Sequence, residues 1–199
     1  MTASRDKYFT IAREATAELK IERSQFIGHA LEAANETAAK EFIAAVQSRH
    51  RQATHNCFAY RLGLGNEETV YYSDAGEPGG TAGRPILGAI TSLELTNVVV
   101  VVTRYFGGKK LGVRGLIEAY GQTARLALEA GGRAERVFTR EMEIVCSYAD
   151  LDRLLYILNG YGGRVAAADY GVEARLKVDV PRSSWEEVRR LLPGQHEYN

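Results

Sequence analysis

The run NVVVVVTRYF, residues 97–106, constrains the fold of this chain more than any other stretch. Five consecutive valines, Val98–Val102, put apolar side chains on both faces of a strand, which predicts a strand at the centre of its sheet. The run is far too short to span a bilayer. Glycines and lysines follow at residues 107–112, and a helical pattern then extends to Gly131. The sequence therefore predicts a buried strand that leads through a glycine-rich turn into a long helix.

The rest of the chain alternates strand and helix patterns and divides into two parts at Arg133–Arg136. Before the boundary we also expect strands at residues 8–13, 26–31, 55–62 and 68–73 and helices at 35–50 and 84–95. After it we expect strand, helix, strand, strand and helix at residues 137–148, 149–163, 163–171, 172–182 and 183–194. Ser183 or Ser184 would cap the last helix, with Glu187 completing a capping box. These patterns predict an α+β protein with domains at residues 1–133 and 137–199.

Composition limits the classes of function. The chain is 45% hydrophobic and 25% charged, as ordinary globular proteins are, and its 25 basic and 25 acidic side chains give zero net charge. This balance argues against a protein that depends on non-specific attraction to phosphates. Cys57 and Cys146 are far apart in the sequence and are expected to be reduced thiols. Neither a secretory signal nor a membrane span is evident, so we expect a cytoplasmic protein without a membrane partner.

The strongest candidate for a binding site is the stretch RYFGGKKLGVR, residues 104–114, here called the basic loop. Its glycines let backbone N–H groups approach a ligand, and the helix that follows adds partial positive charge at its N-terminus. The stretch lacks the ending of a P-loop and the spacing of the dinucleotide fingerprint. It predicts an anion or phosphate site, the alternative being a tight turn with solvated lysines. The candidate residues are Arg104, Gly107, Gly108, Lys109, Lys110, Gly112 and Arg114.

A second glycine-rich stretch, DAGEPGGTAG at residues 74–83, is here called the signature loop. Its carboxylates, Asp74 and Glu77, could bind a cation, accept hydrogen bonds from a ligand, or pair with Arg104 or Lys109 if the two loops are adjacent. The alternative is a loop that only caps the next helix, with Thr81 as the capping residue. The candidate residues are Asp74, Gly76, Glu77, Pro78, Gly80, Thr81 and Gly83.

Three further residues are secondary candidates. His55 and Cys57 lie two apart on one strand face, a couple that could supply a nucleophile or half of a metal site, although packing is the favoured interpretation. With His50 and Asp74 a zinc site can be imagined, but no motif of paired cysteines, HExxH or GxSxG supports it. Tyr105 flanks the basic loop, where aromatic rings suit base stacking or sheet packing. We therefore predict no catalytic residue, no metal and no cofactor.

Four blocks of sequence resemble the IMPACT family, in particular its bacterial YigZ-like branch: RSQFIGHA, ATHNCFAYRLG, SDAGEPGGTAGRPIL and VVVVVTRYFGGKKLGVRGLIEAYG. The resemblance covers nearly the whole chain. It implies an IMPACT-type N-terminal domain with the fold of ribosomal protein S5 domain 2, and a C-terminal ferredoxin-like sandwich similar to elongation factor domains. Many members carry two adjacent aspartates before the Gly-Glu-Pro motif, whereas this chain has Asp74 and Ala75. That departure weighs against an enzyme built on a carboxylate pair.

The resemblance also implies a link to translation, because eukaryotic members regulate translation by protein–protein competition. We expect a non-enzymatic binding or regulatory protein whose N-terminal domain holds phosphate or nucleic acid, with RNA, the ribosome or a translation-related protein as partner. One alternative is an enzyme acting on a small phosphorylated or nucleotide substrate, with Asp74 or Glu77 as metal ligand or base. The other is a protein–protein regulator without nucleic acid. No oligomeric state is predicted.

Overall fold

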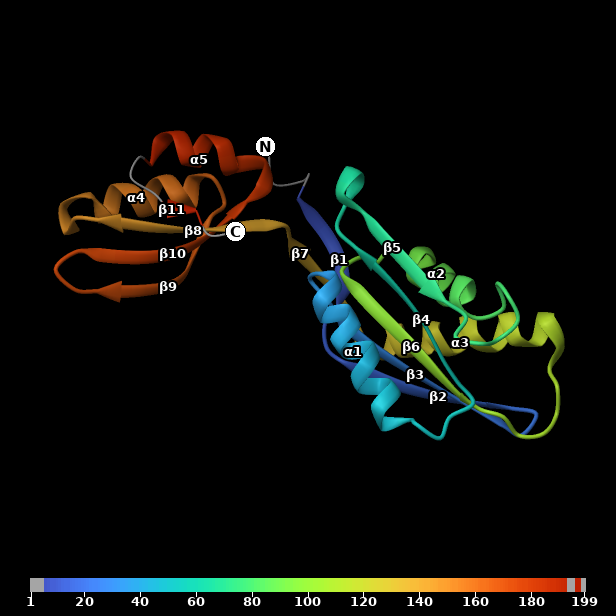
Figure 1. Cartoon of the computed structure of the whole chain (residues 1–199). Helices are drawn as coiled ribbons and strands as arrows, with labels where there is room; N and C mark the ends of the chain where they lie inside the picture. The colour runs from blue at the N-terminus through green and yellow to red at the C-terminus, as the bar shows by residue number, and fades with distance from the viewer. Residues whose placement is uncertain (1–5, 193–195, 198–199) are drawn as a thin grey trace. The chain divides into compact units, whose positions relative to one another are not determined.

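The computed structural model describes residues 6–192 and 196–197, which form a mixed α+β protein with antiparallel sheets and five helices (Figure 1). The predicted α+β class is confirmed. The described part of the chain divides into two compact units, one at residues 9–135 and one that begins at residue 136, and residues 6–8 group with the second. Among the residues that the structure describes, no helix combines the length and the apolarity that a membrane crossing requires.

The first unit is built on a five-stranded sheet in the order β2-β3-β6-β4-β5. The valine run lies in its central strand, as predicted, and Val98–Val102 are fully buried. Val98, Val100 and Val102 pack against α2 and α3 on one face, while Val99 and Val101 pack against α1 on the other (Figure 1). The strands are β2 (Ala15–Ile21), β3 (Ser24–Glu32), β4 (His55–Leu62), β5 (Thr69–Ser73) and β6 (Val98–Tyr105), and the helices α1 (Glu36–Arg49), α2 (Gly83–Ser92) and α3 (Gly112–Gly131).

One strand of this sheet was not predicted. β2 pairs with β3 through a hairpin whose turn is Glu22 and Arg23, both at positive φ. Such a turn usually contains glycine or asparagine. Because neither residue is present here, the sequence did not indicate a hairpin at this position. By contrast, the predicted helix at residues 35–50 is present as α1, and the side chain of Asn35 caps it by accepting a hydrogen bond from the N–H of Ala38.

The second unit has the element order βαββαβ, with the strands arranged as β11-β8-β10-β9. Its elements are β8 (Thr139–Cys146), α4 (Tyr148–Gly160), β9 (Arg164–Tyr170), β10 (Ala174–Pro181), α5 (Trp185–Leu191) and β11 (His196–Glu197). Apolar side chains of β8 and β10 pack against α4 and α5 in a core separate from those of the first unit. Two short strands, β1 (Lys7–Ile11) and β7 (Arg133–Val137), pair with each other near the division between the units.

Ser184 is the N-cap residue of α5, one of the two serines expected there, but the expected capping hydrogen bond is absent. Ser183 donates its N–H and its hydroxyl to the carboxylate of Asp6. The ring of Tyr8 also lies against Phe138, with the centroids 4.1 Å apart. These contacts explain why Asp6 and Tyr8 group with the C-terminal segment. Because the partners are so distant in the sequence, no local sequence pattern could predict the contacts.

Candidate functional site

The signature loop and the basic loop meet at a cavity of about 440 Å³ in the first unit. The signature loop connects β5 to α2, and the basic loop connects β6 to α3. Both strands are antiparallel to β4, which lies between them, so the two loops leave the sheet at the same edge (Figure 1). The cavity is lined by Thr54, His55, Glu77, Pro78, Arg104, Phe106, Lys110, Leu111, Gly112, Val113 and Leu116.

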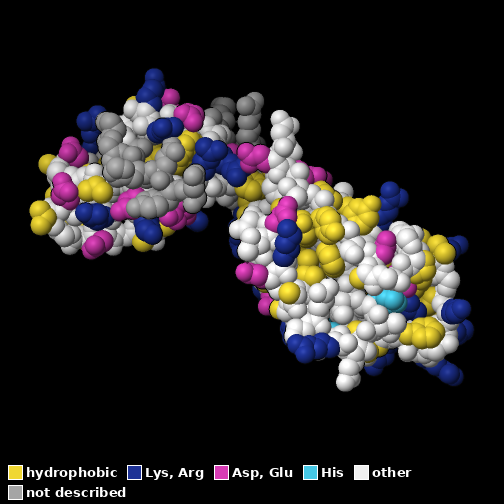
Figure 2. All heavy atoms as spheres, viewed as in Figure 1, with side chains coloured by type: hydrophobic (Ala, Val, Ile, Leu, Met, Phe, Trp, Pro, Cys, Tyr) yellow, Lys and Arg dark blue, Asp and Glu magenta, His cyan; other side chains and the backbone are white. Residues whose placement is uncertain are grey.

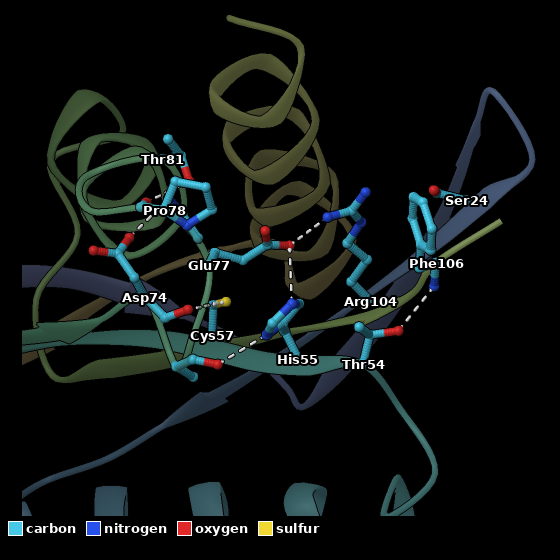
Figure 3. Close-up of polar contacts among 12 residues, drawn as sticks. Ser24, Thr54, His55, Cys57, Asp74, Glu77, Pro78, Thr81, Arg104 and Phe106 are labelled. Atoms are coloured by element: carbon cyan, nitrogen blue, oxygen red, sulfur yellow. Dashed lines mark hydrogen bonds and ion pairs between the residues drawn. The ribbon is translucent and has the colours of Figure 1, made fainter. Parts of the chain in front are cut away.

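A buried ion pair joins the two loops. Arg104 Nη1 donates to Glu77 Oε1 over 2.6 Å, and the side chains of both residues are at least nine-tenths buried. The same carboxylate oxygen accepts a hydrogen bond from the hydroxyl of Tyr120 on α3 at 2.8 Å. The Arg104 guanidinium also lies over the rings of Phe26 and Phe106, at 5.5 and 5.2 Å from their centroids. Arg104 is thus neutralised and held in place within the fold (Figure 3).

Asp74 has a different role from Glu77. Its carboxylate accepts hydrogen bonds from the backbone N–H groups of Gly80, Ala82 and Gly83, at 2.8–2.9 Å, and so caps the start of α2. Burial alone would raise the pKa of this carboxyl, but the three N–H donors outweigh it and the pKa is lowered. The cap was expected at Thr81, whose hydroxyl instead donates to the carbonyl of Pro78.

His55 and Cys57 lie beside the signature loop (Figure 3). The thiol of Cys57 donates to the carbonyl of Asp74 at 2.9 Å, and burial raises its pKa to about 12, so it is a poor nucleophile. His55 Nδ1 is 3.0 Å from the carbonyl of Ala75, which requires a proton on Nδ1 and leaves Nε2 as an acceptor in the neutral ring. Nε2 is 3.9 Å from Glu77 Oε1. Within the described ranges, no three His, Cys, Asp or Glu side chains cluster as metal ligands would.

The remaining cations of the basic loop divide into two groups. Lys110 lines the cavity and makes no ion pair with the residues that the structure describes. Lys109 pairs with Glu22, and Arg114 pairs with Glu118, all on exposed surface. Tyr105 points to the opposite side of the sheet, where its hydroxyl lies 3.0 Å from His50 Nδ1. Lys110 is therefore the lysine of the loop that a ligand in the cavity would meet.

The start of α3 adds positive potential to the same cavity. Helix α3 begins at Gly112, and the first N–H groups of this 20-residue helix, which have no intrahelical partner, receive no side-chain cap either. Gly108 and Gly112 have positive φ, a conformation that glycine adopts without strain, and this conformation forms the turn of the basic loop. The space around both residues is open. Sequence reasoning missed Thr54, Leu111, Val113, Leu116 and Tyr120 as site residues, because their patterns indicate only packing.

Gly107 has a packing role that can be tested by substitution. A Cβ at this position would lie 2.0 Å from the carbonyl oxygen of Arg23, whereas one at Gly79 in the signature loop would meet nothing within 4 Å. We expect Gly107→Ala to lower the free energy of unfolding by about 2–3 kcal/mol, as overpacking does. The matched Gly79→Ala should change it by less than about 0.5 kcal/mol. Urea denaturation measures both, and equal effects would contradict the close approach of Gly107 to the β2–β3 turn.

Comparison with known proteins gives matches along most of the chain. The Impact N-terminal domain family matches residues 22–128, and the domain of unknown function DUF1949 matches residues 144–193. IMPACT family member YigZ of Escherichia coli is 31% identical over 91% of this chain and 89% of its own. IMPACT family member YvyE of Bacillus subtilis is 42% identical over 74% of this chain and 67% of its own. A crystal structure of a hypothetical protein, 28% identical, covers 98% of both chains with a TM-score of 0.70.

Proposed function

The chain belongs to the IMPACT family, and from this we propose a non-enzymatic binding or regulatory protein linked to translation that holds a phosphate-bearing ligand in the cavity between its two glycine-rich loops. The observation that carries the proposal is the convergence of Lys110 and the uncapped start of α3 on one cavity. Backbone N–H groups and a lysine at a helix N-terminus favour phosphate. The translation link rests on the family resemblance.

The buried groups favour binding over catalysis by a carboxylate. The enzymatic alternative uses Asp74 or Glu77 as a metal ligand or base. Asp74 is occupied by three backbone N–H donors, and Glu77 Oε1 is occupied by Arg104 and Tyr120. Using either group for chemistry would require breaking a helix cap or a buried ion pair.

We propose specific folds for the two domains as well. The domain at residues 1–133 would be ribosomal protein S5 domain 2-like, and that at residues 137–199 would be ferredoxin-like. The second assignment is supported by the βαββαβ order and the strand arrangement β11-β8-β10-β9. The first is supported by an antiparallel sheet with α2 and α3 on one face and α1 on the other.

Neighbouring lysines provide the test of the phosphate site. We expect Lys110→Ala to weaken binding of a 5′-phosphorylated tetraribonucleotide about tenfold and to reduce the slope of log affinity against log salt by up to about 1. Lys109→Ala is the matched control, because Lys109 pairs with Glu22 on exposed surface and does not line the cavity. Fluorescence anisotropy from 50 to 300 mM salt, a range set by the steep salt dependence of phosphate contacts, measures both effects. Equal losses in the two variants, or no binding of either the tetraribonucleotide or a ribonucleoside 5′-monophosphate by the wild type, would refute the site.

A second candidate function, a protein–protein regulator, is favoured by a separate groove on the first unit. It has a volume of about 460 Å³ and lies between α1 and the edge strand β5, where the exposed side chains of Val70 and Tyr71 line it. Figure 2 shows hydrophobic side chains gathered over β4 and β5 on this face. The expected result of Tyr71→Arg is loss of a protein partner from nuclease-treated extracts with phosphate binding unchanged. If capture of the partner is unaffected, this function is not located on β5.

A further inference from the structure

The cavity between the two loops is larger and more apolar than a phosphate group requires. Its volume of about 440 Å³ falls in the range of about 300–1,000 Å³ that is typical of clefts for small organic ligands. Pro78, Phe106, Leu111, Val113 and Leu116 provide apolar walls. A hydrated anion would not remove the apolar surface of these walls from water. The ligand should therefore carry a flat or apolar part besides its charged group.

Phe106 provides a surface suited to a flat ring. Its side chain lines the cavity and is 44% exposed, and the Arg104 guanidinium lies 5.2 Å from the ring centroid. The hydrogen bond to Glu77 holds the Arg104 guanidinium in place, so the group that packs against the Phe106 ring is rigid. An exposed aromatic ring beside a cation suits stacking on a nucleobase, because every base presents a π-face.

The polar part of the cavity presents hydrogen-bond acceptors. Glu77 Oε1 accepts hydrogen bonds from Arg104 and Tyr120, whereas Oε2 accepts none from the part of the chain that the structure describes. His55 Nε2 is also an acceptor when Nδ1 donates to Ala75. Beside these acceptors lies one unpaired donor, the buried N–H of Arg104 Nε, which has no partner among the described residues. Because Glu77 Oε2 and His55 Nε2 can each accept a hydrogen bond, this region suits a ligand edge that carries N–H groups.

We propose that the ligand is a single nucleotide unit, with its base against Phe106, the N–H groups of the base edge at Glu77 and His55, and its phosphate at Lys110 and the start of α3. The proposal rests on the phosphate-binding function above and adds the class of ligand. A free nucleotide and the 5′ end of an RNA chain share this chemistry. The site binds the nucleotide without any covalent step.

Isothermal titration calorimetry on the full chain tests the proposal. The probes are inorganic phosphate, ribose 5-phosphate and the four ribonucleoside 5′-monophosphates. We expect at least one monophosphate to bind ten or more times more tightly than ribose 5-phosphate, because only the monophosphates bring a base to Phe106. A 5′-phosphorylated tetraribonucleotide distinguishes the two sources: it should match the best monophosphate if the site takes RNA ends, and bind at least tenfold more weakly if it takes free nucleotides.

Substitution of Phe106 locates the base. Phe106→Leu keeps an apolar side chain and should remove the tenfold advantage of the nucleotide while leaving the affinity for ribose 5-phosphate unchanged. Tyr71→Leu is the matched control, because Tyr71 is an exposed aromatic residue that does not line this cavity. Thermal unfolding verifies that both variants fold.

The outcomes separate this inference from the proposed function. If monophosphates and ribose 5-phosphate bind equally and Lys110→Ala weakens both, the phosphate site stands and the nucleotide inference falls. If the advantage of the nucleotide survives in Phe106→Leu, the base binds elsewhere and the inference also falls. If none of the probes binds, both proposals are refuted.

Discussion

Replacing Glu77 with alanine should lower the free energy of unfolding by about 3–5 kcal/mol. The substitution leaves the guanidinium of Arg104 without its anion, and the Arg104 side chain is only 6% exposed. It also removes the acceptor for the buried hydroxyl of Tyr120. A buried charge without a partner costs several kcal/mol, far more than an exposed pair contributes. Urea denaturation monitored by circular dichroism gives the difference.

A double substitution separates loss of charge balance from loss of packing. Glu77→Leu combined with Arg104→Met replaces the pair with apolar side chains of similar size and should recover most of the stability, as such exchanges often do. Glu118→Ala removes the partner of Arg114 in an exposed pair and should cost less than about 0.5 kcal/mol. If Glu77→Ala also costs less than about 1 kcal/mol, water reaches Arg104 and the pair is not buried as described.

The division of roles between Asp74 and Glu77 shows what sequence alone can predict about the site. That the signature and basic loops would be neighbours followed from the strands that lead into them. Which carboxylate would face Arg104 did not follow, because both have the same charge and lie three residues apart. The backbone conformation determines which carboxylate faces Arg104. Ala75 and Gly76, both at positive φ, turn the loop so that Asp74 faces the N–H groups at the start of α2.

The adjacent lysines give the same lesson about side-chain direction. The sequence treats Lys109 and Lys110 as equivalent cations, but Lys109 pairs with Glu22 in the β2–β3 turn. That turn was absent from the prediction, because its residues at positive φ are Glu22 and Arg23 and not glycine. Because the β2–β3 hairpin was not predicted, the sequence did not indicate that Lys109 would pair with Glu22 and that Lys110 would line the cavity. The central valine strand, by contrast, was predicted from its own sequence pattern and did not require knowledge of residues distant in the sequence.

Acid should destabilise the chain through His29, which is 5% exposed on β3. Burial, and then the charges of His50 and Arg49, lower the pKa of His29 from 6.5 to about 4. Its Nδ1 is 3.2 Å from the hydroxyl of Thr16, and its Nε2 is buried without a partner. Between pH 6.5 and 4 the unfolded chain therefore binds a proton that the folded chain does not, so protonation favours unfolding.

The sign and the size of this effect follow from the lowered pKa. The contribution of His29 to stability is fully present above pH 6.5 and is lost as the pH falls toward 4, at a total of about 3 kcal/mol. His29→Gln, whose side chain does not titrate, should flatten the dependence of the unfolding free energy on pH by about that amount in this window. His50 lies beside His29, with the ring centroids 5.0 Å apart, and its pKa is lowered too, so part of the slope should remain in the variant.

The comparison of slopes distinguishes titration from packing. A glutamine that merely packs less well at position 29 would lower stability equally at pH 7 and pH 4.5 and leave the slope of the wild type intact. Urea denaturation at half-unit steps of pH gives both slopes. Above about pH 5 the lowered pKa of the Asp74 carboxyl contributes little to the slope, because that group is ionised there in both the folded and the unfolded chain. Parallel curves for the wild type and His29→Gln would mean that solvent reaches His29 and that its ring titrates as it does in the unfolded chain.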